Sequence, residues 1–178
     1  MAPMGMAAEV STSTEATSGL VSWVWRDESA TITLNQLLPD QVRAFFQGRG
    51  FSAEQSERVA RHCVFQMIVR NEAQATTPMD VALDEWRVIS ADTTIGIPRT
   101  ASDWDQEWGR LGVGQGPRIA FRWALFPASQ QFQPGDWNMG MLTLAVPVGA
   151  TFDLQAVWHS GAELQDATID DLRCAEDR

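Results

Sequence analysis

The sequence predicts an α+β fold that is mainly antiparallel β, arranged as a sandwich or as a single curved sheet. Short runs of alternating apolar and polar residues recur along the chain, separated by turns rich in Gly and Pro. These runs do not alternate with helices in the way that a parallel βαβ fold requires. A third observation is a helical pattern at about 39–72, which predicts a helical hairpin inserted between strands.

The N-terminal part of the chain is polar, and the first strands follow it. Residues 1–19 are rich in Ser, Thr, Ala and Glu and are expected to be flexible, whereas 20–178 is expected to form a single α+β domain. Gly5 and Ala7, on either side of Met6, resemble the small-x-small end of a signal peptide, so this segment is either a signal-peptide remnant or a flexible start. The alternations at 21–25 and 31–34 predict two strands joined by a turn.

Two helices are predicted within the hairpin. Pro39 and Asp40 begin the first helix, and Gly48 ends it. The second begins at a capping box that starts with Ser52 and is expected to continue to Asn71. This length is inferred from six apolar residues at i, i+3, i+4 spacing: Val59, Ala60, Cys63, Val64, Met67 and Ile68.

The rest of the chain is predicted to be strands and one short helix. A strand over 79–88 is expected to contain a bulge at Asp84 and Glu85. Ser102 is expected to cap a short helix at about 102–111. From Arg118 onward the pattern predicts strands only, at 118–125, 137–146, 152–158 and 167–174.

The composition excludes several classes of function. All thirteen basic residues are Arg, and 23 acidic residues give a net charge of −10, so neither a nucleic acid nor an anionic membrane is expected as a partner. Without Lys, the chain lacks the amine that Walker A, Schiff-base and pyridoxal enzymes need. Because no apolar run reaches about 18 residues, no transmembrane segment is expected.

The two cysteines, Cys63 and Cys174, lie too far apart in the sequence for a CxxC redox pair or a zinc knuckle. The simplest prediction is a disulfide that joins the core-facing side of the second helix to the last strand. Such a bond indicates an oxidising compartment, so a bacterial periplasmic or secreted location is expected. The alternative is a cytosolic protein with two buried thiols.

The main candidate site is a copper site. Met139 and Met141 are two residues apart and therefore lie on one face of their predicted strand. A hairpin through the turn at 148–149 would place His159 opposite residue 139. Thioethers bind Cu(I) and imidazole binds either copper state, so copper is the one cofactor that the sequence suggests. The alternative is that both methionines pack against the helices.

The leading functional prediction is a non-catalytic accessory protein of the cell envelope, either a copper-handling chaperone or a module that binds a protein partner. A second hypothesis is a carbohydrate-binding module in which a sugar stacks on Trp137 beside Asp136 and Asn138. A third is a hydrolase with paired carboxylates, for which the candidates are Asp103, Asp105 and Glu107 on the short helix and Asp170 with Asp171 near the end. No GxSxG, HExxH or CxxC motif supports catalysis.

Overall fold

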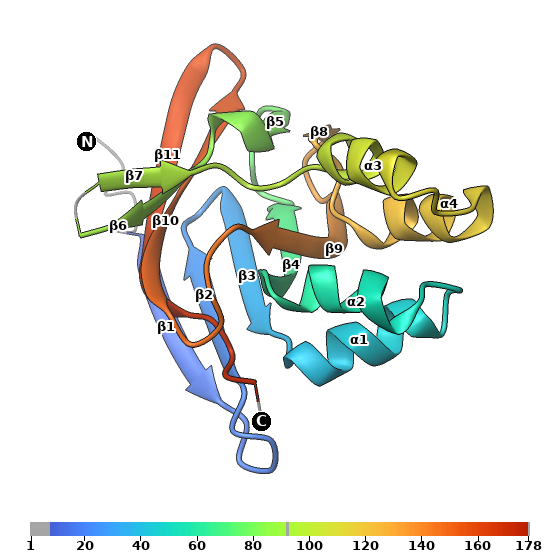
Figure 1. The fold of residues 1–178 in the computed structure, drawn as a ribbon. Coiled ribbons are helices and arrows are strands. Elements are labelled where there is room, and N and C mark those ends of the chain that lie inside the picture. The colour runs from blue at the N-terminus through green and yellow to red at the C-terminus, as the bar shows by residue number, and fades with distance from the viewer. Residues whose placement is uncertain (1–7, 92, 178) are drawn as a thin grey trace, which may run out of the picture.

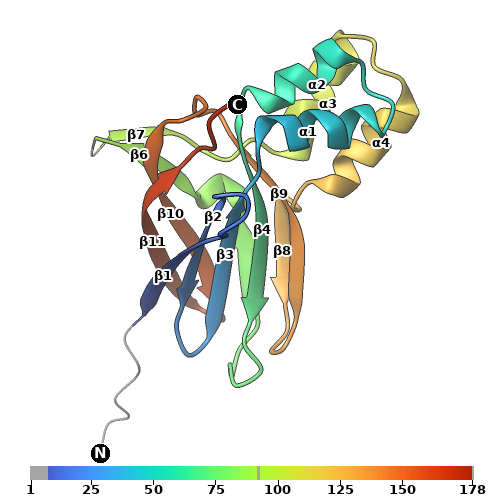
Figure 2. The same cartoon turned by 90° about the horizontal axis from the view of Figure 1, so that it is seen from below.

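The computed structural model describes residues 8–91 and 93–177. Over these residues it is mostly antiparallel β, with 44% strand and 24% helix, which confirms the predicted fold class. Two sheets face each other, and the helices gather at one end of them (Figures 1 and 2). Residues 1–7, which include the suggested signal-peptide remnant, lie outside the described residues.

The first sheet has five strands in the order β1-β2-β3-β4-β9, and all neighbours are antiparallel. Its strands are β1 (Glu9–Thr14), β2 (Val21–Arg26), β3 (Ala30–Gln36), β4 (Cys63–Asn71) and β9 (Trp137–Leu144). The strand β1 forms where a flexible segment was predicted. All six of its residues are exposed, so backbone pairing with β2 holds it and no buried alternation signals it.

The second sheet has six strands. Five follow the order β7-β6-β10-β5-β8, and β11 pairs with β10. Its strands are β5 (Met79–Ala82), β6 (Arg87–Ser90), β7 (Thr93–Gly96), β8 (Ser129–Phe132), β10 (Thr151–Ser160) and β11 (Glu163–Arg173). Where a bulge was predicted, a 3₁₀ turn, η1 (Leu83–Glu85), separates β5 from β6.

The largest group of buried side chains fills the space between the two sheets, and we call it the between-sheet core. Trp25 and Trp158, one from each sheet, meet edge to face with their ring centroids 5.3 Å apart. Phe65 of β4 and Phe152 of β10 meet in the same way at 6.2 Å. The inward residues of both sheets therefore interdigitate, as in a β-sandwich.

A second group of buried side chains, the helical core, lies where the helices cover the outer face of β4. The helices are α1 (Pro39–Gln47), α2 (Ala53–Ala60), α3 (Ala101–Arg110) and α4 (Gln115–Ala124). Phe46, Trp104, Trp108 and Phe121 dominate this core, and Val64 of β4 forms part of its floor. The helices α2 and α3 begin with capping boxes, that of α2 at Ser52 as predicted and that of α3 at Thr100 instead of Ser102.

The prediction of one helix from Ser52 to Asn71 is wrong. The helix α2 ends at Ala60, and β4 begins at Cys63. A spacing of four residues fits a strand face as well as a helix face, so Cys63 and Met67 agree with both patterns. The outward side chain of Val64 is also buried, beneath the helices, and this additional apolar residue imitates a helical stripe.

The predicted strand at 118–125 is also wrong, because this segment forms most of the helix α4. Phe121 and Leu125 lie one turn apart and are buried in the helical core. Ile119 and Trp123 are 43% and 84% exposed. The alternation that predicted a strand therefore combines two buried residues with two exposed ones.

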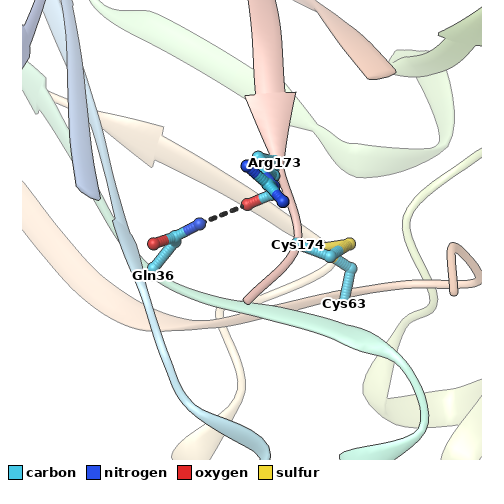
Figure 3. Close-up of a disulfide and its surroundings, with 4 residues drawn as sticks. All are labelled: Gln36, Cys63, Arg173 and Cys174. Atoms are coloured by element: carbon cyan, nitrogen blue, oxygen red, sulfur yellow. Dashed lines mark hydrogen bonds between the residues drawn. A yellow bond between two sulfur atoms is a disulfide. The ribbon is translucent and has the colours of Figure 1, made fainter. Parts of the chain in front are cut away.

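The disulfide between Cys63 and Cys174 is present, with a Cα–Cα distance of 5.2 Å (Figure 3). Because Cys63 begins β4 and Cys174 follows β11, the bond joins the two sheets, not a helix to a strand as predicted. Beside it, Gln36 Nε2 donates a hydrogen bond of 2.7 Å to the Arg173 carbonyl oxygen (Figure 3). The end of β11 is thus fastened to the first sheet at two points.

Candidate functional site

A groove of about 370 Å³ lies between α4 and the start of β9. We call it the α4–β9 groove. Its surface is mainly apolar, and Arg122 is its one charged lining residue among the described residues. The lining residues are Ala101, Arg122, Trp123, Leu125, Phe126, Pro127, Ala128, Asn138 and Met139.

Gly140 allows the wall of this groove to form. After α4 the chain runs along β9, where the Phe126 N–H donates to the Met141 carbonyl oxygen at 2.9 Å. A Cβ atom at residue 140 would lie only 2.4 Å from the Phe126 nitrogen and 2.6 Å from its Cα. Because backbone atoms cannot give way as a flexible side chain can, glycine is required for this close approach.

Three exposed apolar side chains extend from the groove along β9, and we call them the apolar strip: Trp123, Met139 and Trp137. They are 84%, 48% and 54% exposed, respectively. Trp123 and Met139 both line the groove, and Trp137 lies two residues before Met139 on the same strand face. A contiguous apolar surface of this kind is a common feature of binding sites.

The polar groups predicted to bind a sugar are already engaged. The Asn138 side chain donates to Gln130 Oε1 at 2.6 Å and accepts from the Met139 N–H at 2.8 Å. Asp136 Oδ2 accepts from the Gln133 N–H at 2.8 Å. Trp137 is exposed beside both residues, but their hydrogen bonds fix the β8–β9 turn and the strand edge.

The structure does not bring the three predicted copper ligands together. Met139 and Met141 share the outer face of β9, as expected, and Met141 packs against the helical core. His159 lies on the other sheet, opposite Asp80 of β5 and Leu164 of β11. The predicted hairpin register is wrong because β9 pairs with β4, and the chain crosses to the second sheet before β10 begins.

His159 instead contacts Glu85, with 3.3 Å between Nε2 and Oε1, in a separate hollow of about 360 Å³. Across residues 8–91 and 93–177, no three His, Cys, Asp or Glu side chains are placed to hold a metal ion. A copper-binding role for the remaining pair, Met139 and Met141, stays a prediction.

Two of the carboxylates proposed for a hydrolase, Asp103 and Asp105, have structural partners. Asp103 Oδ2 accepts from the Thr100 N–H at 2.8 Å and completes the capping box of α3. Asp105 receives two hydrogen bonds from Arg118, at 2.9 and 2.8 Å. Hydrogen bonding to Arg118 lowers the pKa of Asp105, so this carboxylate is a poor proton donor near neutral pH.

A partly buried charge network lies where α2 joins β4. His62 Nδ1 is 2.9 Å from the Arg58 carbonyl oxygen and donates to it, which leaves Nε2 to accept from Arg99 at 3.5 Å. Arg99 also pairs with Glu107 and stacks over the Trp104 ring at 3.8 Å. Burial is the main reason that the pKa of His62 is lowered. These contacts attach α3 to the sheet.

The sequence did not identify Trp123 or Arg122 as site residues, because both were assigned to a strand. The one local signal for a helix was Pro117, which lies in the first turn of α4 and suits that position. Which side of α4 lies against the other helices depends on packing, so exposure of Trp123 was not predictable from this segment.

No family model, curated protein or solved structure matches this chain. The helices of the described residues include none that is long and apolar enough to cross a membrane. A proposal for function therefore depends on the geometry of the site.

Proposed function

We propose that this protein is a non-catalytic accessory module of the cell envelope that binds a protein partner in the α4–β9 groove. The observation that carries the proposal is the 84% exposure of Trp123 at the edge of an apolar groove. Burial of an apolar side chain such as an indole lowers the free energy, and an exposed indole does not provide this gain to the folded protein. Binding of a partner over the indole would provide it. Trp is also among the residue types that contribute most to binding at protein interfaces.

The groove has the size and chemistry for an apolar anchor residue of a partner. Its volume of about 370 Å³ can hold one large side chain. Leu125 and Phe126 form part of its lining and are buried in the helical and the between-sheet core, respectively. The groove is thus preformed on rigid elements, which limits the entropy cost of binding.

The disulfide supports a location outside the cytoplasm. Cys63 and Cys174 are both buried and bonded to each other, and such structural disulfides persist mainly in oxidising compartments. We therefore propose that the binding module lies in the periplasm or outside the cell.

A carbohydrate is the second candidate ligand, because Trp123 and Trp137 offer two exposed aromatic faces on one surface. A protein partner is favoured because the amide of Asn138 and the carboxylate of Asp136 are occupied by intramolecular hydrogen bonds. A sugar would need several such groups to be free for its hydroxyls.

The test is selection from a random dodecapeptide library on the full chain, followed by affinity measurement in solution. We expect enriched peptides with an apolar residue that bind the wild type and bind Trp123→Ala at least about tenfold more weakly. Because Trp123 is exposed, the variant should keep the melting temperature of the wild type.

Leu164→Ala is the matched control. Leu164 is 63% exposed on β11 and does not line the groove, so its removal should leave peptide affinity unchanged. Failure to enrich any peptide, or equal affinity for wild type and Trp123→Ala, would contradict the proposal. A glycan-array signal that is lost in Trp123→Ala would support the carbohydrate alternative instead.

A further inference from the structure

Two arginines, Arg122 and Arg70, lie beside the apolar strip and lack strong acidic partners. Arg122 lines the groove, and its nearest carboxylate oxygen, on Asp105, is 3.9 Å away. Asp105 already receives both hydrogen bonds of Arg118. Arg122 therefore retains donor capacity at the groove.

A second arginine lies at the other end of the strip. The Arg70 guanidinium lies over the Trp137 ring, 5.7 Å from its centroid. Among the described residues, no carboxylate is within ion-pair distance of Arg70. By contrast, Arg43 on α1 is bound by three carboxylates, those of Asp40, Glu57 and Asp177.

The apolar strip is therefore bordered by Arg122 at one end and by Arg70 at the other. We propose that the segment bound in the α4–β9 groove is an acidic part of a protein partner, whose carboxylates pair with Arg122 and Arg70 on either side of its apolar anchor. This inference rests on the proposed function and adds the charge of the partner. Guanidinium and carboxylate groups form two parallel hydrogen bonds, which fix orientation as well as adding binding energy.

The net charge of −10 would repel an acidic partner at long range. Salt reduces this repulsion, since the screening length is about 8 Å at physiological ionic strength, so the local arginines dominate at contact. Asp105, which is near Arg122, is held by Arg118, and Asp136, which precedes Trp137, accepts a hydrogen bond from the Gln133 N–H. A basic segment would instead be repelled by the positive charges of Arg122 and Arg70.

The experiment uses the peptides enriched in the selection described above as probes of the full chain. We expect a negative mean charge in these peptides, and an affinity that falls about tenfold between about 50 and 500 mM NaCl. The variant Arg70→Gln/Arg122→Gln should bind about tenfold more weakly and lose most of this salt dependence. Arg110→Gln, which removes an exposed arginine of α3 outside the groove lining, should bind as the wild type does.

The failure of this inference is distinguishable from failure of the proposed function. Enriched peptides that are neutral or basic, yet still require Trp123, would overturn the acidic partner and leave partner binding intact. Sedimentation provides a second test: a dimer that dissociates in Trp123→Ala would identify a second copy of this chain as the occupant and overturn the inference.

Discussion

The between-sheet core and the helical core differ in how they are held together. The between-sheet core is larger, contains the disulfide, and lies between two hydrogen-bonded sheets. The helical core is smaller, is dominated by rings such as stacked Trp104 and Trp108, and has no covalent link. In the described structure, the buried indole N–H of Trp108 also has no hydrogen-bond partner. We infer that the sandwich provides most of the stability, whereas α4 and β9 form the proposed binding surface.

The disulfide should give the largest effect in this comparison. Replacing both cysteines by alanine removes a link between residues 111 apart, and the chain-entropy model predicts a loss of about 4.7 kcal/mol in the free energy of unfolding. Urea denaturation of the wild type and of Cys63→Ala/Cys174→Ala measures this loss. The wild type in reductant serves as the control and should lose a similar amount. A loss below about 1 kcal/mol would show that the sandwich does not depend on the bond.

Removing one ring from each core compares them directly. Phe121→Ala in the helical core and Phe65→Ala in the between-sheet core should each cost about 3–4 kcal/mol, because both rings are at most 1% exposed. If the helices unfold independently, Phe121→Ala should produce an early transition that removes helical circular dichroism and spares the sheets. Phe65→Ala should lower a single transition. Identical unfolding curves for the two variants would argue that the cores form one cooperative unit.

Gly140→Ala examines the junction between the two cores. The added methyl group would meet the Phe126 backbone, so we expect a loss of about 1–3 kcal/mol in unfolding free energy. Displacement of Phe126 would also reshape the groove and weaken peptide binding. Gly116→Ala is the control, since no atom lies within 4 Å of its added Cβ. Equal stability of Gly140→Ala and the wild type would show that the wall of the groove is mobile.

The smallest predicted effect concerns pH. Burial and the charge of Arg99 lower the pKa of His62, so the unfolded chain binds this proton at higher pH than the folded chain does. The contribution of neutral His62 to stability is therefore fully present above pH 6.5 and decreases as the pH falls below it. We expect the free energy of unfolding to depend less steeply on pH in His62→Gln than in the wild type, between about pH 7 and 5.5. The slopes should differ by less than about 1.4 kcal/mol per pH unit, the most that one titrating group can contribute. An unchanged slope would contradict this assignment.

Part of the fold was predictable because the signal is local. The turn residues and alternations around Trp23 and Ile32 predicted β2 and β3, and the capping box at Ser52 predicted the start of α2. The pairing of Cys63 with Cys174 followed from there being two cysteines and no metal or redox spacing. In each case the neighbouring residues carry the information.

The errors occur where the helical core meets the sheet. The start of β4 is apolar on both faces, because Val64 lies under the helices and Cys63 faces the other sheet, and this double burial resembles a helix. In α4, exposed Trp123 completed a false strand alternation. Core packing normally places apolar residues on the buried face of an element, and the exposed Trp123 departs from this pattern. Such departures are expected where a residue serves a function other than packing.

The sequence by itself determined the mainly antiparallel α+β class, the disulfide pair, and the placement of Met139 and Trp137 on one strand face. These features depend on side-chain period, turn residues and cysteine number, which are properties of the chain alone. Only the tertiary structure decided that β9 pairs with β4, which separates His159 from Met139, and that Trp123 lies exposed beside Arg122. Strand partners and helix orientation are set by contacts between distant segments, so the groove exists only once the two cores have packed together.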